Sequence, residues 1–320
     1  MNKISVNIAT VLTVLVMIAV ISGAMPIPRN VKRPFPNSQF AVLDSSLVHY
    51  RLWVTNVKPA KGKLLFVHGF MGSTYSFRKC YDSLCAAGFN ILSMDLPPFG
   101  YGSRDIPADY SVYAMGRLIW RMADEIDLGD TSRWDIIGHC TGGSAAEAAA
   151  IIRPGRVRSL ILTDATFFER NNGKMTVGFD PMKIKGIKGI YSEYLSSGTM
   201  DFPRLRSLLQ SGYGRLPDTS DVTGYLLPLR IPGTADAIDF SLKHPAEKKP
   251  LDCKAIAKLP VLVIWGEKDS WIPKSAVKKI KKLLPACQVK IIPGAGHMPM
   301  ETEQEEFRRI LLEFLSRLRT

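Results

Sequence analysis

The 320-residue sequence lacks the signatures of several large classes of protein. It has no internal repeat and no low-complexity tract, which excludes a solenoid and a chain of biased, disordered composition. Its cysteines and histidines never fall at zinc-ligand spacing, and neither a G-x-G-x-x-G nor a Walker pattern occurs. We therefore expect no metal and no other cofactor. With 46% hydrophobic and 22% charged residues, the length suits one large domain with an insertion, or two small domains.

Acidic residues are in the minority, with 29 Asp and Glu against 42 Lys and Arg and a formal charge of +13. Such an excess of positive charge can bind nucleic acid, an anionic membrane or an acidic polymer. The basic residues are scattered, however, with small clusters only at Lys183–Lys188 and Lys278–Lys282. No nucleic-acid motif and no alternation of aromatic with basic residues accompanies them. The pattern predicts a solvated basic surface and no nucleic-acid partner.

The N-terminus carries the longest apolar stretch, residues 4–21, after Lys3 and before the small residues Ser22-Gly23-Ala24. This order is typical of a secretory signal peptide. The stretch also approaches the roughly 20 residues that span a bilayer, so an uncleaved anchor is the rival interpretation. We predict a signal peptide or membrane anchor at 1–24 and a proline-rich linker at 25–37. The folded domain is then secreted or periplasmic, or associated with a membrane through residues 4–21.

Five cysteines are too few for a disulfide framework in a chain of this length. Cys80 and Cys85 share a predicted helix and are expected to be small buried hydrophobes. Cys253 and Cys287 have the option of pairing, although nothing in the sequence requires it.

Short apolar runs alternate with helical periodicity along most of the chain, beginning with two strands joined by a tight turn. The predicted strands are 40–43, 47–54, 64–67, 91–94, 134–137, 157–162, 261–265 and 289–292. This order predicts an α/β domain at 38–320 with a mostly parallel sheet and helices on both faces. The alternation stops at about 166–258, which we interpret as an inserted helical lid with short helices near 203–209 and 235–242. The final helix has an apolar stripe, and Thr302 with Glu305 predicts a capping box.

Polar residues follow the strands at the edge where open α/β sheets carry their active sites. One strand runs into Gly138-His139-Cys140-Thr141-Gly142 and then a small-residue helix. A G-x-C-x-G pattern alone fits a buried inert cysteine equally well. Asp269 follows a later strand and His297 the last one. A nucleophile, an acid and a histidine in this order are typical of hydrolase triads.

With these residues in place, the chain resembles the α/β-hydrolase superfamily over about residues 38–318. It is most similar to the lid-bearing single-domain branch, which includes esterases, epoxide hydrolases, haloalkane dehalogenases and C–C bond hydrolases. The resemblance implies an eight-stranded sheet, with Cys140 as nucleophile, His297 as general base and Asp269 as orienting acid. The backbone N–H groups of Phe70 and Thr141 would form the oxyanion hole.

Other polar residues compete for roles or suggest structural ones. Asp164 follows the strand before the insertion, where some related enzymes place the triad acid, and is the alternative to Asp269. Asp95 stands where the superfamily has a structural aspartate. His68 and His139 are expected to shape the backbone, whereas His49 and His244 stand alone and suggest surface or packing positions.

Cysteine is a departure, because most relatives have serine at this turn and the dehalogenases and epoxide hydrolases have aspartate. A cysteine excludes their alkyl-ester chemistry and fits acyl transfer through a thioester. We therefore predict an esterase-like hydrolase that cleaves an ester, lactone, thioester or amide of a small apolar molecule. An acyltransferase with the same triad and a non-catalytic binding protein of the same fold are the alternatives.

Overall fold

The computed structural model describes residues 33–43, 46–104, 109–127, 129–171, 174–177, 187–243 and 253–319. The signal peptide or anchor predicted at 1–24 lies outside these residues, as do His244 and most of the linker at 25–37. Those expectations therefore stay predictions. Within the described part of the chain, no helix combines the length and the apolar character that crossing a bilayer requires.

The core is an eight-stranded sheet in the order β1-β2-β4-β3-β5-β6-β9-β10. Its strands are β1 (Ser38–Leu43), β2 (Ser46–Trp53), β3 (Gly62–Val67), β4 (Phe89–Met94), β5 (Trp134–His139), β6 (Val157–Thr163), β9 (Val261–Gly266) and β10 (Gln288–Ile292). Strand β2 pairs antiparallel with β1 and β4, and the pairs from β4 to β10 are parallel. The leading hairpin and the mostly parallel eight-stranded sheet are thus confirmed.

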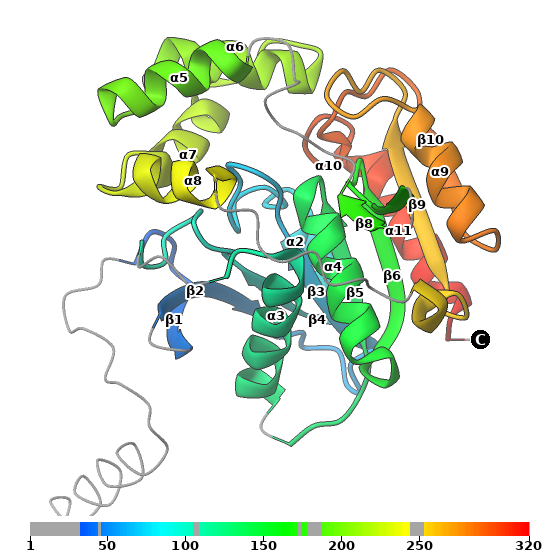
Figure 1. Ribbon diagram of the computed structural model, residues 1–320. Coiled ribbons are helices and arrows are strands. Elements are labelled where there is room, and N and C mark those ends of the chain that lie inside the picture. The colour runs from blue at the N-terminus through cyan, green and yellow to red at the C-terminus, as the bar shows by residue number, and fades with distance from the viewer. Residues whose placement is uncertain are drawn as a thin grey trace, which may run out of the picture.

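Helices cover both faces of the sheet, as predicted (Figure 1). One face packs on α2 (Tyr81–Ala86) and α11 (Gln304–Arg317), and the other on α3 (Val112–Asp127), α4 (Thr141–Ile152) and α9 (Ser275–Leu283). The alternating strand residues Leu64 and Leu65 face these two cores. Small residues let α3 approach α4, since a Cβ at Gly116 would come within 2.8 Å of the Ala149 nitrogen.

Between β6 and β9 the chain leaves the sheet and forms the insertion. It contains the hairpin β7 (Phe168–Asn171) and β8 (Lys174–Val177), then helices α5 (Ile187–Ser197), α6 (Phe202–Tyr213), α7 (Thr219–Leu229) and α8 (Thr234–Lys243). Helix α6 begins where Asp201 accepts a hydrogen bond from the Arg204 amide and ends at Gly214, which has φ 71°. The helices lie over the carboxyl ends of the strands (Figure 1). That this insertion works as a lid stays a prediction.

Three local details differ from the prediction or refine it. The short helices η1 (Pro154–Arg156), η3 (Cys253–Ile256) and α10 (Pro299–Thr302) were not foreseen. The capping box is wrong, because α11 begins at Gln304 and the Thr302 hydroxyl donates to the Met298 carbonyl instead. Cys80 is buried, Cys85 is half-buried, and Cys287 carries a free thiol.

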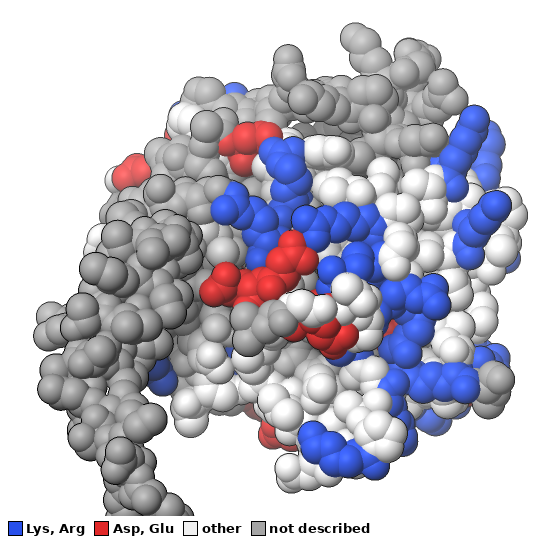
Figure 2. All heavy atoms as spheres, turned by 90° about the horizontal axis from the view of Figure 1, so that it is seen from below, with Lys and Arg blue, Asp and Glu red and all other residues white. Residues whose placement is uncertain are grey.

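The face opposite the insertion carries many basic side chains around an acidic group (Figure 2). Near the amino ends of the strands, Lys63 and Arg156 both pair with Asp127, and Arg158 pairs with Asp135. Part of the positive charge is therefore neutralised locally. That arrangement fits a solvated surface, and the absence of a nucleic-acid partner stays a prediction.

Candidate active site

Cys140 lies on a sharp turn between strand β5 and helix α4. Its backbone is strained, with φ 51° and ψ −127°. The glycines two residues before and after Cys140 are required because a side chain at either position would clash with the backbone. A Cβ at Gly138 would come within 2.5 Å of the Gly142 carbonyl oxygen, and one at Gly142 within 2.3 Å of the His68 carbonyl oxygen. This is the local geometry of a nucleophile elbow.

Two backbone amides lie beside this turn. Gly69 packs so tightly on the cysteine that an added Cβ would come within 2.5 Å of Cys140 Cβ and 3.3 Å of its Sγ. The amide of Phe70 follows this contact by one residue in the chain. Thr141 is the first residue of α4, so its N–H has no acceptor within the helix. Both positions fit the predicted oxyanion hole, a role that stays a prediction.

His297 and Asp269 are joined directly, with Nδ1 of the histidine 2.9 Å from Oδ2 of the aspartate. The other carboxylate oxygen accepts hydrogen bonds from the Trp271 and Ile272 amides at 2.8 and 3.0 Å. The aspartate is thus fixed by its own loop while it orients the ring. Of the two acids that the sequence left open, Asp269 rather than Asp164 holds His297 Nδ1.

The second ring nitrogen of His297 faces the cysteine side of the site. Nε2 is buried and makes no regular hydrogen bond within the part of the chain that the structure describes. Burial disfavours the imidazolium, but the Asp269 carboxylate and then Cys140 outweigh this effect and raise the pKa of His297 well above its ordinary value. The ring is therefore a strong proton acceptor beside a thiol.

The insertion supports the histidine loop directly, which the sequence did not reveal. The His297 amide donates to the Gly212 carbonyl at the end of α6, at 2.6 Å. The Trp271 ring lies 4.8 Å from the His297 ring, and its Nε1–H donates to the Ser211 hydroxyl at 2.9 Å. His139 Nε2 lies 2.9 Å from the His297 carbonyl oxygen. Burial lowers the pKa of His139 to about 3, so this ring is neutral and donates that hydrogen bond.

The remaining polar residues of the strand ends are structural. Asp95 accepts hydrogen bonds from the Thr74 and Tyr101 amides and bonds to His49 Nδ1 at 2.7 Å, which is the role expected of it. His49 is therefore part of a buried network rather than isolated. His68 accepts a hydrogen bond from the Leu96 amide at 2.8 Å, which shapes the loop before Phe70.

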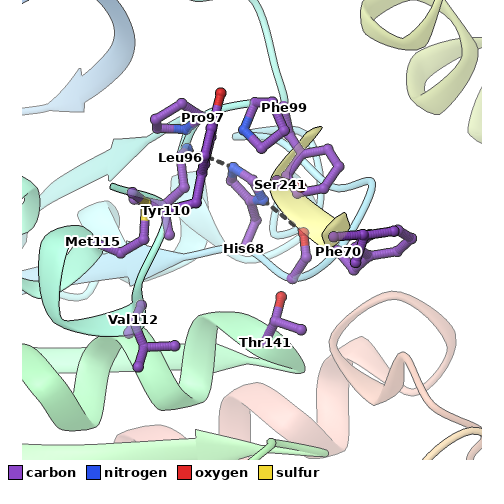
Figure 3. A pocket seen from close by; sticks show the side chains of 14 residues that line it. His68, Phe70, Leu96, Pro97, Phe99, Tyr110, Val112, Met115, Thr141 and Ser241 are labelled. Atoms are coloured by element: carbon purple, nitrogen blue, oxygen red, sulfur yellow. Dashed lines mark hydrogen bonds between the residues drawn. The ribbon is translucent and has the colours of Figure 1, made fainter. Parts of the chain in front are cut away.

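A cavity of about 180 Å³ lies beside the two candidate oxyanion residues. Phe70 and Thr141 are among the residues that line it, and most of the others are apolar (Figure 3). The apolar walls come from the loop after β4, from α3 and α4, and from α8: Leu96, Phe99, Val112, Met115, Ala145 and Leu242. An apolar group of a substrate fits this space, because the walls offer it apolar contacts in place of water.

A second buried group, here named the Arg78 cluster, was also missed by the sequence reasoning. Its members are Arg78, Asp221, Glu301, Tyr213 and Tyr225. Arg78 pairs with Asp221 and Glu301, and both tyrosine hydroxyls donate to Glu301. Tyr213 and Asp221 belong to the insertion, whereas Arg78 and Glu301 belong to the core. The cluster therefore joins the two, and its long sequence separations left no local signal.

Comparison with known proteins places this geometry in a family. The profile of the alpha/beta hydrolase fold family matches residues 63–304. Lipase 1 of Psychrobacter immobilis is 27% identical over 260 residues, which cover 80% of this chain and 77% of the lipase. A 2-hydroxy-6-oxononadienedioate/2-hydroxy-6-oxononatrienedioate hydrolase of Cupriavidus pinatubonensis (strain JMP 134 / LMG 1197) is 24% identical over 289 residues, 87% of this chain and 95% of that enzyme.

A solved structure agrees with the fold. An esterase from Rhodococcus sp. ECU1013 superposes with a TM-score of 0.69 at 22% identity and covers 88% of this chain and 99% of its own. At that identity the likeness concerns the fold alone. Together with the family profile and the strand order, it leads to one conclusion: this chain belongs to the α/β-hydrolase family.

Proposed function

We propose that this protein hydrolyses an ester, lactone, thioester or amide of a small apolar substrate through an acyl-cysteine intermediate. Cys140 is the nucleophile, His297 the general base and Asp269 the acid that orients it. The observation that carries the proposal is the strained Cys140 turn beside a histidine whose far nitrogen is held by Asp269 at 2.9 Å. The names of the Psychrobacter and Cupriavidus relatives, a lipase and a hydrolase, support this class of reaction.

The reaction follows from the positions of the groups. Cys140 Sγ attacks the substrate carbonyl carbon as a thiolate whose proton is held on His297 Nε2. The oxygen of the tetrahedral intermediate takes the negative charge and accepts hydrogen bonds from the Phe70 and Thr141 amides. His297 returns the proton to the leaving group as its bond to carbon breaks, which leaves a thioester. Water, deprotonated by His297, then opens the thioester and releases the acid and the free thiol.

The position of the cavity assigns the two halves of the substrate. The leaving group must lie beside His297, because this residue protonates it. The apolar cavity is lined by Phe70 and Thr141 but not by His297. The acyl half therefore points into the cavity. Its volume of about 180 Å³ suits a short acyl chain or a single aromatic ring, since an apolar cavity of about 150 Å³ holds benzene.

Mass spectrometry of the protein after incubation with p-nitrophenyl esters of increasing acyl length tests the proposal. We expect an acyl adduct on residue 140 in the wild type or in Cys140→Ser, and turnover that Cys140→Ala abolishes. Turnover that survives in Cys140→Ala would show that the nucleophile is wrong. No adduct and no turnover across the panel would favour a binding protein. Preferential transfer to an added alcohol over water would favour an acyltransferase.

A further inference from the structure

Asp164 is a buried carboxyl group that the proposed reaction does not use. It follows β6, where the chain departs into the insertion, and its side chain is excluded from solvent. Its backbone is held at φ 42°, a conformation that aspartate adopts only at a cost. Its Oδ1 accepts a hydrogen bond from the Gly266 amide at 2.8 Å. Because Gly266 opens the turn that carries Asp269, Asp164 fixes the loop of the triad acid.

The side chain of Asp164 also lies against the triad acid, Asp269. Ligand atoms of Asp164, Asp269 and His297 all lie within 4.8 Å of one another. As a carboxylate, Asp164 Oδ2 has no hydrogen-bond donor in the described part of the chain. The backbone amides of Trp271 and Ile272, in the same loop as Asp269, donate to Asp269 Oδ1 instead. A bare carboxylate there would leave a buried charge unpaired, which is costly.

A proton on Asp164 removes this conflict. A protonated Oδ2 becomes a donor, and the acceptor beside it is the Asp269 carboxylate. Burial and the Asp269 charge raise the pKa of Asp164 well above its ordinary value. Burial acts in the same direction on Asp269, but the hydrogen-bonded His297 reverses it and lowers the pKa of that group. The two environments thus shift the pKa values apart, which favours a neutral Asp164 beside an ionised Asp269.

We propose that Asp164 is a positioning residue that remains protonated at neutral pH and donates its Oδ2 proton to Asp269. The two aspartates then carry a single negative charge, which balances the positive charge of the His297 imidazolium. Two more titratable groups lie beside His297: Cys140 raises the pKa of His297, and His139 is neutral and donates to the His297 carbonyl. The role in catalysis rests on the proposed function, whereas the shared proton is measurable without any substrate.

The two neighbouring aspartates provide a matched pair of variants. In Asp164→Asn, the amide oxygen still accepts from Gly266 and the amide N–H₂ donates where the proton lies. We expect kcat/KM within about tenfold of the wild type, because a hydrogen bond of similar geometry is kept. Asp269→Asn should lose on the order of 10⁴-fold, since it stabilises the wrong histidine tautomer. Comparable losses in the two variants would overturn the proposal.

Stability against pH tests the proton in the enzyme without substrate. A raised pKa means that folding takes up a proton once the pH exceeds the unfolded value of about 3.9, so the native state loses stability as pH rises. The Asp164→Asn variant has no such group and does not lose stability in this way. We expect its free energy of unfolding to be no higher than that of the wild type near pH 4 and increasingly higher than that of the wild type towards alkaline pH. A difference that does not change with pH would contradict the proposal.

Infrared spectroscopy gives a second readout that is independent of activity. At neutral pH the wild type should show the carbonyl stretch of a protonated carboxyl group. The band should vanish in Asp164→Asn. Cys140→Ala is the control that should keep it. A band that persists in Asp164→Asn would assign the proton to another group and overturn the inference.

Discussion

Two buried groups of polar side chains flank the end of helix α6, and they differ in how completely their atoms are paired. In the Arg78 cluster, both Glu301 oxygens accept hydrogen bonds and Arg78 pairs with two carboxylates. Beside Cys140, by contrast, His297 Nε2 and Asp164 Oδ2 lack regular partners among the described residues. Buried polar atoms are normally satisfied, so two exceptions beside the proposed triad are consistent with a role in the reaction. The Arg78 cluster joins the insertion to the core, and we propose that the group beside Cys140 moves protons.

Breaking the paired group should produce the largest change in stability. Glu301→Gln removes a fully buried charge opposite Arg78, and the free energy of unfolding should fall by roughly 3–5 kcal/mol. Urea denaturation measures this. Glu305→Gln, an exposed change nearby in the same part of the chain, is the control and should stay within about 0.5 kcal/mol. Equal, small losses in both variants would mean that the Arg78 cluster does not hold the insertion.

The two groups also differ in what the sequence reveals. The elbow around Cys140 is a local sequence pattern. Gly138 contacts residues of the following helix, and Gly142 contacts the end of the neighbouring strand β3. The succession of strands along the chain follows from short apolar runs that alternate with helical segments. The presence of the sheet and the placement of Asp269 and His297 at strand ends could therefore be predicted. These features depend on short-range periodicity and on the rules that connect parallel strands.

The insertion and its contacts could not be predicted in the same way. Arg78 and Glu301 are separated by 223 residues, and no periodicity links them. The Gly212 carbonyl accepts from the His297 amide, although 85 residues and several elements separate the two positions. The Thr302 capping box failed for a local reason, because the chain forms the short helix α10 there and the Thr302 hydroxyl donates to the Met298 carbonyl four residues back. Tertiary contacts therefore determine the surroundings of Arg78, Glu301 and Gly212, whereas a local hydrogen bond determines that of Thr302.

The cavity offers an intermediate test, because it belongs to the reactive side of the comparison yet is lined by the insertion. Leu242→Ala removes an apolar wall contributed by α8. The ratio of kcat/KM for a longer acyl ester to that for a short one should rise by about 10–200-fold, the usual effect of a methylene-scale change in a pocket. Steady-state kinetics with the p-nitrophenyl ester series measures it. Leu216→Ala, at a 56% exposed position, is the matched control.

If the ratio is unchanged in Leu242→Ala while the esters are still cleaved, the acyl half of the substrate lies elsewhere. The proposed hydrolysis would stand, and only the assignment of the cavity would fail. A change of similar size in Leu216→Ala would instead point to a general loosening of the insertion.

The smallest effect is expected at Trp271, where the insertion touches the catalytic loop near solvent. Trp271→Phe keeps an aromatic ring at this position, but it removes the hydrogen bond to Ser211 and part of the packing against Gly212. That bond is exposed, so its loss should cost about 0.5–1.5 kcal/mol of unfolding free energy and leave kcat/KM nearly unchanged. Trp271→Ala also uncovers the buried His297 ring and should lower kcat/KM further. If kcat/KM falls equally in Trp271→Phe and Trp271→Ala, the hydrogen bond to Ser211 rather than the aromatic ring supports His297. In that case an exposed contact of the insertion would matter for activity, contrary to the comparison with the buried Arg78 cluster.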